Sequence, residues 1–116
     1  MISLDAVLKI GGSLERASNL ETLCREISRL GKRYRLLVVP GGGEFADQVR
    51  KSCQRYPLED TAAHRMALLA MDQYGYLLNQ LIGDSVLIAD TSQIRNAVEA
   101  RRVVVFLPSS MVNKVR

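Results

Sequence analysis

Short, continuous apolar runs alternate along the chain with longer segments in which apolar residues recur every three or four positions. The apolar runs lie at 7–10, 35–39, 86–89 and 103–107. Runs of this length, rich in β-branched residues, are typical of strands buried in a parallel sheet. The intervening segments have the spacing of amphipathic helices. The pattern therefore predicts an α/β fold, a three-layer αβα sandwich around a mainly parallel sheet, formed by a single domain over residues 1–116.

Local signals mark the helix ends. Ser18-Asn19-Leu20-Glu21 has the S-x-x-E form of a capping box, so a helix is expected to begin there and to end at Leu30, before Gly31. Further helices are expected over 44–54, 61–81 and 92–100. The apolar stripe of the 61–81 helix is wide enough to be covered on more than one side, either by the chain's own core or by a partner chain.

Glycines directly follow the first two predicted strands. Lys9 lies in the first run, which leads into Gly11 and Gly12, and the second run leads into Pro40 and the triple glycine 41–43. Without a Cβ, glycine lets backbone N–H groups approach anionic oxygens, and a following helix adds its positive end. A buried lysine needs an anionic partner such as phosphate, whereas a lysine on an edge strand extends to solvent. Two anion sites are predicted side by side at the carboxyl edge of one sheet.

The two motifs in this order, Lys9-Ile10-Gly11-Gly12-Ser13 and Val39-Pro40-Gly41-Gly42-Gly43, resemble the amino acid kinase family. That family includes aspartate, acetylglutamate, uridylate and isopentenyl phosphate kinases. The resemblance implies an ATP-dependent phosphotransferase that uses ATP and Mg²⁺ and phosphorylates a small-molecule acceptor. It also implies the site residues: Lys9, the catalytic residue, binds the transferred phosphoryl group with Gly11, Gly12 and Ser13, and the acceptor site is lined by Gly41, Gly42 and Gly43.

The resemblance covers only the amino-terminal half of the family fold. That half is expected to bind the phosphoryl group and the acceptor, whereas the nucleotide-binding carboxyl-terminal half is expected to be absent. The 116-residue chain is therefore interpreted as a fragment of a longer kinase that is inactive alone.

The residues after the triple glycine bear on the acceptor. Isopentenyl phosphate kinases have a G-G-G-x-F-G-H pattern there, in which Phe45 matches and Asp47 replaces the histidine. A carboxylate repels an acceptor phosphate and suits a cationic amine. The 61–81 helix, with His64, is also similar to a compact archaeal and methylotroph branch that phosphorylates an aminomethyl-furan methyl phosphate in methanofuran biosynthesis. Phe45, Asp47 and His64 are thus added to the expected substrate site, with the helix start near the loops. A lone histidine is nevertheless more often a packed or surface residue than a catalytic one.

Composition narrows the function classes. The net charge is +4, and the basic residues are scattered apart from two clusters, Arg29 to Arg35 and Arg101 to Arg116. These clusters could bind nucleic acid, but solvated helix ends and loops are the preferred interpretation. Aromatic residues make up only 5%, which disfavours a stacking surface for single-stranded nucleic acid. The single histidine excludes a multi-histidine metal site, and no metal ligand is predicted.

No apolar run approaches the roughly 20 residues of a membrane span, and no signal peptide is evident, so a cytoplasmic protein is expected. Cys24 and Cys53 are expected to be reduced and packed inside.

Two other functions fit the same pattern. One is a non-catalytic protein that binds a nucleotide or oxyanion on this fold, and the other is a regulatory subunit that assembles through its long helix. In the resembled family the corresponding helix often lies in a dimer interface, which implies a homodimer or higher homo-oligomer through Thr61 to Leu81. The kinase interpretation is preferred because Lys9 and two glycine loops exceed what assembly requires.

Overall fold

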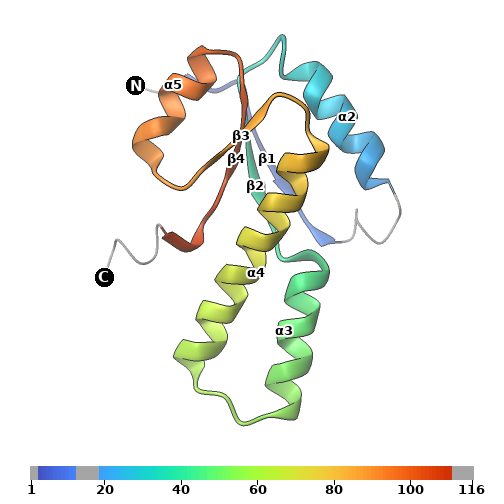
Figure 1. Ribbon diagram of the computed structural model, residues 1–116, viewed down its shortest axis with the longest axis vertical. Helices are drawn as coiled ribbons and strands as arrows, with labels where there is room; N and C mark the ends of the chain where they lie inside the picture. The colour runs from blue at the N-terminus through green and yellow to red at the C-terminus, as the bar shows by residue number, and fades with distance from the viewer. Residues whose placement is uncertain (1–2, 13–18, 111–116) are drawn as a thin grey trace.

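The computed structural model describes residues 3–12 and 19–110, and within these residues four strands form one parallel sheet (Figure 1). The strands are β1 (Ala6–Ile10), β2 (Leu36–Pro40), β3 (Ser85–Ile88) and β4 (Val103–Phe106). Their spatial order is β1-β2-β4-β3, and every neighbouring pair is parallel. The predicted α/β class and parallel sheet are confirmed. Ser13 and Ser18, named in the sequence analysis, lie outside the described residues.

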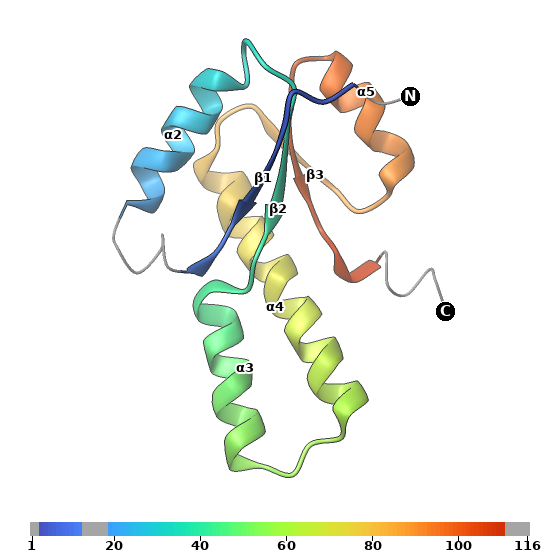
Figure 2. The same cartoon turned by 180° about the vertical axis from the view of Figure 1, so that it is seen from behind.

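Helices cover both faces of the sheet. The helices α2 (Leu20–Leu30) and α4 (Asp60–Leu81) pack on one face, whereas α5 (Ile94–Glu99), which follows the 3-10 turn η1 (Thr91–Gln93), packs on the other. Figures 1 and 2 show α2 and α5 on opposite sides of the strands. The helix α3 (Gly43–Arg55) pairs with the first half of α4 in a hairpin that projects beyond the carboxyl ends of the strands (Figure 2).

The main core lies between the sheet and the pair α2 and α4. Its buried side chains come from β1, β2, β4 and both helices: Ile10, Leu20, Cys24, Ile27, Leu36, Val38, Tyr74, Leu78, Ile82, Val103 and Val105. A smaller core under α5 contains Ile88, Ile94, Val98, Val104 and Phe106. Because β4 contributes to both cores, all four of its residues are buried, which explains its uninterrupted apolar run.

The strand β1 lies at the edge of the described sheet, and only one of its faces is covered. Ile10 is 2% exposed against the main core, whereas Val7 is 58% exposed and Lys9 is also exposed. The core under α5 draws its strand residues from β2, β3 and β4. The prediction of a strand buried on both faces is therefore wrong for β1, and the edge-strand alternative describes the position of Lys9.

Gly31 ends α2 as predicted, but for a different physical reason from a left-handed cap. Its φ of −63° is right-handed. A Cβ at this position would lie 2.3 Å from Cγ2 of Val103. Glycine is therefore required here because the end of α2 packs directly against β4.

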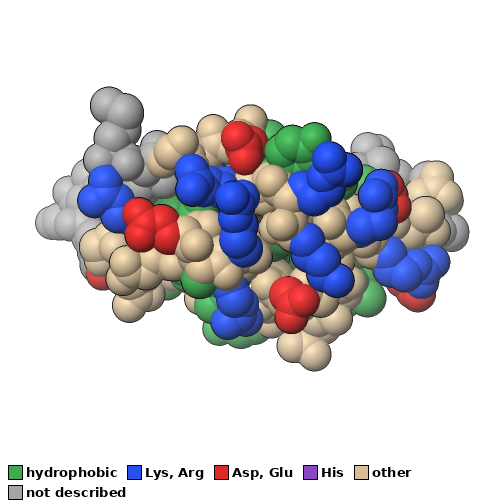
Figure 3. Space-filling model, turned by 90° about the horizontal axis from the view of Figure 1, so that it is seen from above, with side chains coloured by type: hydrophobic (Ala, Val, Ile, Leu, Met, Phe, Trp, Pro, Cys, Tyr) green, Lys and Arg blue, Asp and Glu red, His purple; other side chains and the backbone are tan. Residues whose placement is uncertain are grey.

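The end of the sheet at which the strands begin, opposite the glycine loops, is rich in basic side chains (Figure 3). Lys32 and Arg33 follow α2, and Arg101 and Arg102 follow α5, so that all four lie beside helix carboxyl ends. Arg102 donates hydrogen bonds to the backbone carbonyls of Asp84, just before β3, and of Ser85, its first residue. Positive charge at a helix carboxyl end is stabilising, and this accounts for the basic edge.

The two cysteines differ in burial, which makes their reactivity a test of the packing of α2. Cys24 is buried and Cys53 on α3 is exposed, contrary to the expectation that both pack inside. Burial raises the pKa of the Cys24 thiol to about 11. Because the thiolate is the reactive form, we expect a thiol reagent near neutral pH to modify Cys53 alone in the native protein and both cysteines in denaturant.

Mass spectrometry after labelling measures this difference. The Cys53→Ser variant serves as the control and should remain unlabelled until it is unfolded. Rapid native labelling of Cys24 would contradict the described packing of α2 against the sheet.

Candidate functional site

The carboxyl ends of β1 and β2 bring the two glycine loops into contact. Ile10 and Pro40 are partners in the parallel register, so the two strands end level with each other. The Gly41 N–H donates a hydrogen bond to the Ile10 carbonyl at 2.7 Å, and a Cβ on Gly41 would lie 3.2 Å from the Cα of Gly11. The structure thus contains the predicted arrangement of two glycine loops side by side at one sheet edge.

The glycines of these loops are not equivalent. A Cβ on Gly42 would lie 2.1 Å from the Cβ of Ala46, and Gly43 has a left-handed φ of 57°, so both are required by the start of α3. A Cβ on Gly11, in contrast, would meet no atom of the described residues within 4 Å, apart from its neighbours in the chain. Within this part of the chain, no side chain fills the space beside Gly11.

The middle of α4 lies against the first glycine loop and the ends of β2 and β4. Tyr74 is fully buried, and its hydroxyl donates a hydrogen bond to the Gly11 carbonyl at 3.1 Å. A Cβ on the next residue, Gly75, would lie 2.9 Å from Cδ2 of Leu107 and 3.4 Å from Cγ of Pro40. Gly75 thereby lets the helix backbone approach the ends of β2 and β4 closely.

The segment after β4 is held by the same part of α4. The carboxylate of Asp72 accepts hydrogen bonds from the Ser109 N–H, at 3.2 Å, and from the Ser109 hydroxyl. The Ser110 hydroxyl donates to the Ala89 carbonyl, just after β3, at 3.3 Å. No role was predicted from the sequence for Ser109 and Ser110, whereas the polar stretch from Asp72 to Tyr76 inside a long apolar helix was a visible indication of close packing at this point.

Phe45 and Asp47, both expected in the substrate site, have partners within the protein. The ring of Phe45 packs against Tyr74, with 6.5 Å between the ring centroids, and it borders the main core. Asp47 forms an ion pair with Arg50 one turn along α3. Phe45 therefore has a packing role, and the carboxylate of Asp47 already has a cationic partner.

His64 is not brought to the glycine loops. The helix α3 begins at the second loop and is 13 residues long, so it carries the chain about 20 Å away before α4 starts. His64 is exposed and precedes Tyr74 by ten residues, roughly 15 Å along the helix axis. The expectation that the start of this helix lies near the loops is wrong, because the chain enters α4 at the far end of the α3–α4 hairpin (Figure 2).

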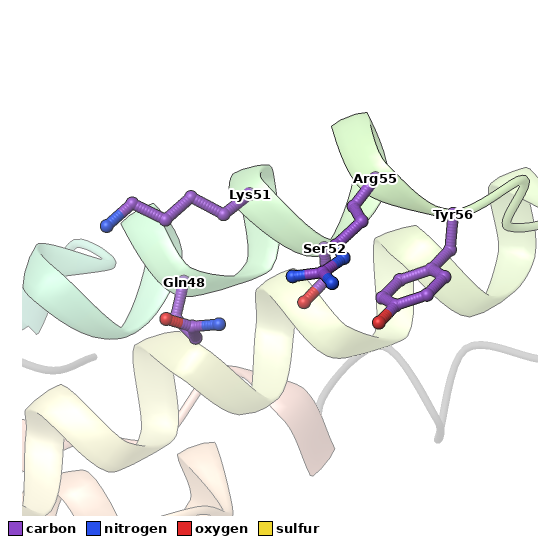
Figure 4. A pocket seen from close by; sticks show the side chains of 5 residues that line it. All are labelled: Gln48, Lys51, Ser52, Arg55 and Tyr56. Atoms are coloured by element: carbon purple, nitrogen blue, oxygen red, sulfur yellow. The ribbon is translucent and has the colours of Figure 1, made fainter.

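A pocket on α3 is separate from the glycine loops (Figure 4). It is lined by Gln48, Lys51, Ser52, Arg55 and Tyr56. In residues 3–12 and 19–110, no group of three or more His, Cys, Asp or Glu side chains is placed to hold a metal ion. The helices of this same part of the chain include none long and apolar enough to cross a membrane.

Comparisons with known proteins agree with this geometry. The sequence profile of the amino acid kinase family matches residues 6–113. The chain is 27% identical over 108 residues to the [5-(aminomethyl)furan-3-yl]methyl phosphate kinase of Methanocaldococcus jannaschii, covering 91% of this chain and 49% of that protein. Its fold is similar to uridylate kinase from Archaeoglobus fulgidus, with a TM-score of 0.73 and 24% identity, over 86% of this chain and 49% of the other. The chain thus spans about half the length of these relatives.

Because Gly42 and Gly11 differ in their surroundings, an added methyl group should change the free energy of unfolding by different amounts at the two positions. Gly42→Ala should lower the free energy of unfolding by about 1–3 kcal/mol, because its Cβ overlaps the Cβ of Ala46. Gly11→Ala should leave the unfolding free energy unchanged within about 0.5 kcal/mol. Urea unfolding followed by circular dichroism measures both values. Equal destabilisation by the two variants would mean that the space beside Gly11 is closed.

Proposed function

Because the chain belongs to the amino acid kinase family, we propose that it forms the phosphoryl- and acceptor-binding half of an ATP-dependent small-molecule kinase. The observation that carries this proposal is the direct backbone contact between the two glycine loops at the ends of β1 and β2. Phosphoryl transfer requires the attacking and leaving oxygens to be held in line, with the reacting atoms about 3–3.5 Å apart. Two adjoining anion-binding loops suit that requirement.

In this proposal, the first loop holds the transferring group and the second faces the acceptor. The phosphoryl ligands are Lys9, Gly11, Gly12 and Ser13, and the acceptor site is lined by Gly41, Gly42 and Gly43. An acceptor oxygen attacks the γ-phosphorus of ATP while the bond from that phosphorus to the ADP oxygen breaks. The Lys9 ammonium and the loop N–H groups stabilise the negative charge on the transferring group.

This proposal is supported by the space beside Gly11, which no described side chain fills and which an anionic oxygen of such a ligand would occupy. Mg²⁺, when bound, neutralises charge on the nucleotide phosphates. The described residues offer no carboxylate cluster to hold the ion, so no step is assigned to Mg²⁺ on this half.

The acceptor that we propose is an amine-bearing phosphate like the one named for the Methanocaldococcus jannaschii relative, [5-(aminomethyl)furan-3-yl]methyl phosphate. The support for an amine is Asp47, on the second turn of the helix that follows the acceptor loop. To bind the amine, Asp47 must exchange its ion pair with Arg50 for the acceptor. His64 is left out of this site because it lies on the outer part of the hairpin.

A second candidate function, assembly, is favoured by the outer surface of α4. Leu69 is 48% exposed and Tyr76 is 56% exposed. They are seven positions apart, which is about two helical turns, so they lie on one face. We propose that two copies pack through this face into a homodimer or a unit of a larger homo-oligomer. A non-catalytic subunit that binds a nucleotide or an oxyanion would use the same surface.

The kinase proposal predicts a large loss of turnover on removal of Lys9. In the full-length protein, Lys9→Ala should lower kcat by about 10²–10³-fold, the typical cost of losing one group that stabilises transition-state charge. The fold should persist because Lys9 is exposed. Coupled measurement of ADP formation reports kcat, and Lys32→Ala, at another exposed lysine, is the matched control. Near-normal turnover of Lys9→Ala would refute the assignment.

The assembly proposal predicts that a charge on α4 separates the copies. Leu69→Glu should weaken self-association at least tenfold and shift the measured mass toward the 12.9 kDa of one chain. Size-exclusion chromatography with light scattering measures this mass. The control is Leu58→Glu, at a 37% exposed leucine before α4, which should leave assembly intact. A wild-type chain that stays monomeric at high concentration would exclude this interface.

A further inference from the structure

We propose that Tyr74 is a positioning residue that orients the peptide group between Gly11 and Gly12, so that the Gly12 N–H faces the ligand of the first loop. The inference rests on the proposed function, because that ligand is the transferring phosphoryl group. Tyr74 has no exposed surface, and its hydroxyl donates to the Gly11 carbonyl oxygen at 3.1 Å.

This hydrogen bond sets the direction of a second group. The carbonyl of Gly11 and the N–H of Gly12 belong to one planar peptide group, in which a trans bond points them in opposite directions. No cis peptide bond occurs among the described residues. Since the Gly11 carbonyl is directed at Tyr74 on α4, the Gly12 N–H is directed away from α4.

Lys9 lies on the same side as this N–H. Successive side chains of a strand alternate between its faces. Ile10 faces the main core beneath α2 and α4, so Lys9 faces away from α4, and it is exposed. Tyr74 therefore directs an N–H donor to the side on which β1 presents its ammonium group. Convergent donors of this kind stabilise charge that develops on a transferring group.

The ring that carries the hydroxyl is fixed by packing. It lies in the main core, 6.5 Å from the ring of Phe45 between centroids. The neighbouring Gly75 holds α4 close to the ends of β2 and β4, which limits movement of the helix relative to the loops. A positioning group must be locked by such surroundings to orient its target.

Removal of this hydroxyl tests the inference. In the full-length protein, Tyr74→Phe should lower kcat with [5-(aminomethyl)furan-3-yl]methyl phosphate about tenfold or more. The KM for this acceptor should change less than about threefold. The matched control is Ser28→Ala, which removes a hydroxyl that donates to the Gly83 carbonyl at 3.0 Å, at the opposite edge of the sheet. A lower melting temperature with kcat within twofold of wild type would show a purely structural hydroxyl and overturn the inference.

A second measurement reads the same peptide group without turnover. In ¹H–¹⁵N spectra of the same polypeptide, tripolyphosphate should shift the Gly12 amide, and Tyr74→Phe should weaken this binding at least fivefold. A Gly12 amide that does not respond, or binding unchanged by Tyr74→Phe, would overturn the inference. A wild type that binds tripolyphosphate through Gly12 but phosphorylates no acceptor would contradict the proposed function and leave the inference standing.

Discussion

The close crossing of α4 over the carboxyl ends of the strands is the constraint on which the candidate site depends. At Gly75 the helix backbone comes so near to β2 and β4 that a single methyl group would lie 2.9 Å from Leu107. Because the helix backbone comes this close, side chains of the same turn can contact two different segments. Tyr74 donates a hydrogen bond to the first loop, and Asp72 accepts one from the segment after β4. The helix α4 thereby contacts three segments that are far apart in the sequence: the first loop, the end of β2 and the segment after β4. A helix standing a few ångströms farther out would leave each segment with only its local contacts.

The position of β1 gives the site an open side. With the strand order β1-β2-β4-β3, the small helix α5 packs over β3 and β4, while the outer face of β1 keeps Val7 and Lys9 exposed. The opposite face of the same strand is closed by the main core. Successive side chains of β1 therefore have different roles because they alternate between its two faces. The even-numbered residues pack in the core, and Lys9 is exposed to solvent or to a bound anion. This separation explains why an edge strand can carry a charged residue without a cost in burial.

Much of the fold could be predicted because it depends on local patterns. Apolar runs gave the strands within one or two residues, and the adjacency of the glycine loops followed from parallel pairing of β1 and β2. The errors concern facts that no local pattern encodes. His64 was misplaced because the α3–α4 hairpin reverses which end of α4 is near the sheet. Cys53, predicted inside, is exposed because α3 packs chiefly against α4. The ion pair of Asp47 with Arg50 could not be predicted from the sequence, because it depends on side-chain rotamers.

The glycines in the sequence do not by themselves distinguish a ligand site from a packing requirement, and the structure explains why. Gly31, Gly42 and Gly75 are required by close packing, and Gly43 by its left-handed backbone, so their presence says nothing about a ligand. Gly11 differs because neither reason applies to it, while a buried tyrosine holds its carbonyl from behind. Among the described residues, nothing would prevent a side chain at Gly11. A glycine that neither packing nor backbone conformation requires is therefore one whose presence bears on the proposed ligand, and this physical distinction separates Gly11 from the structural glycines.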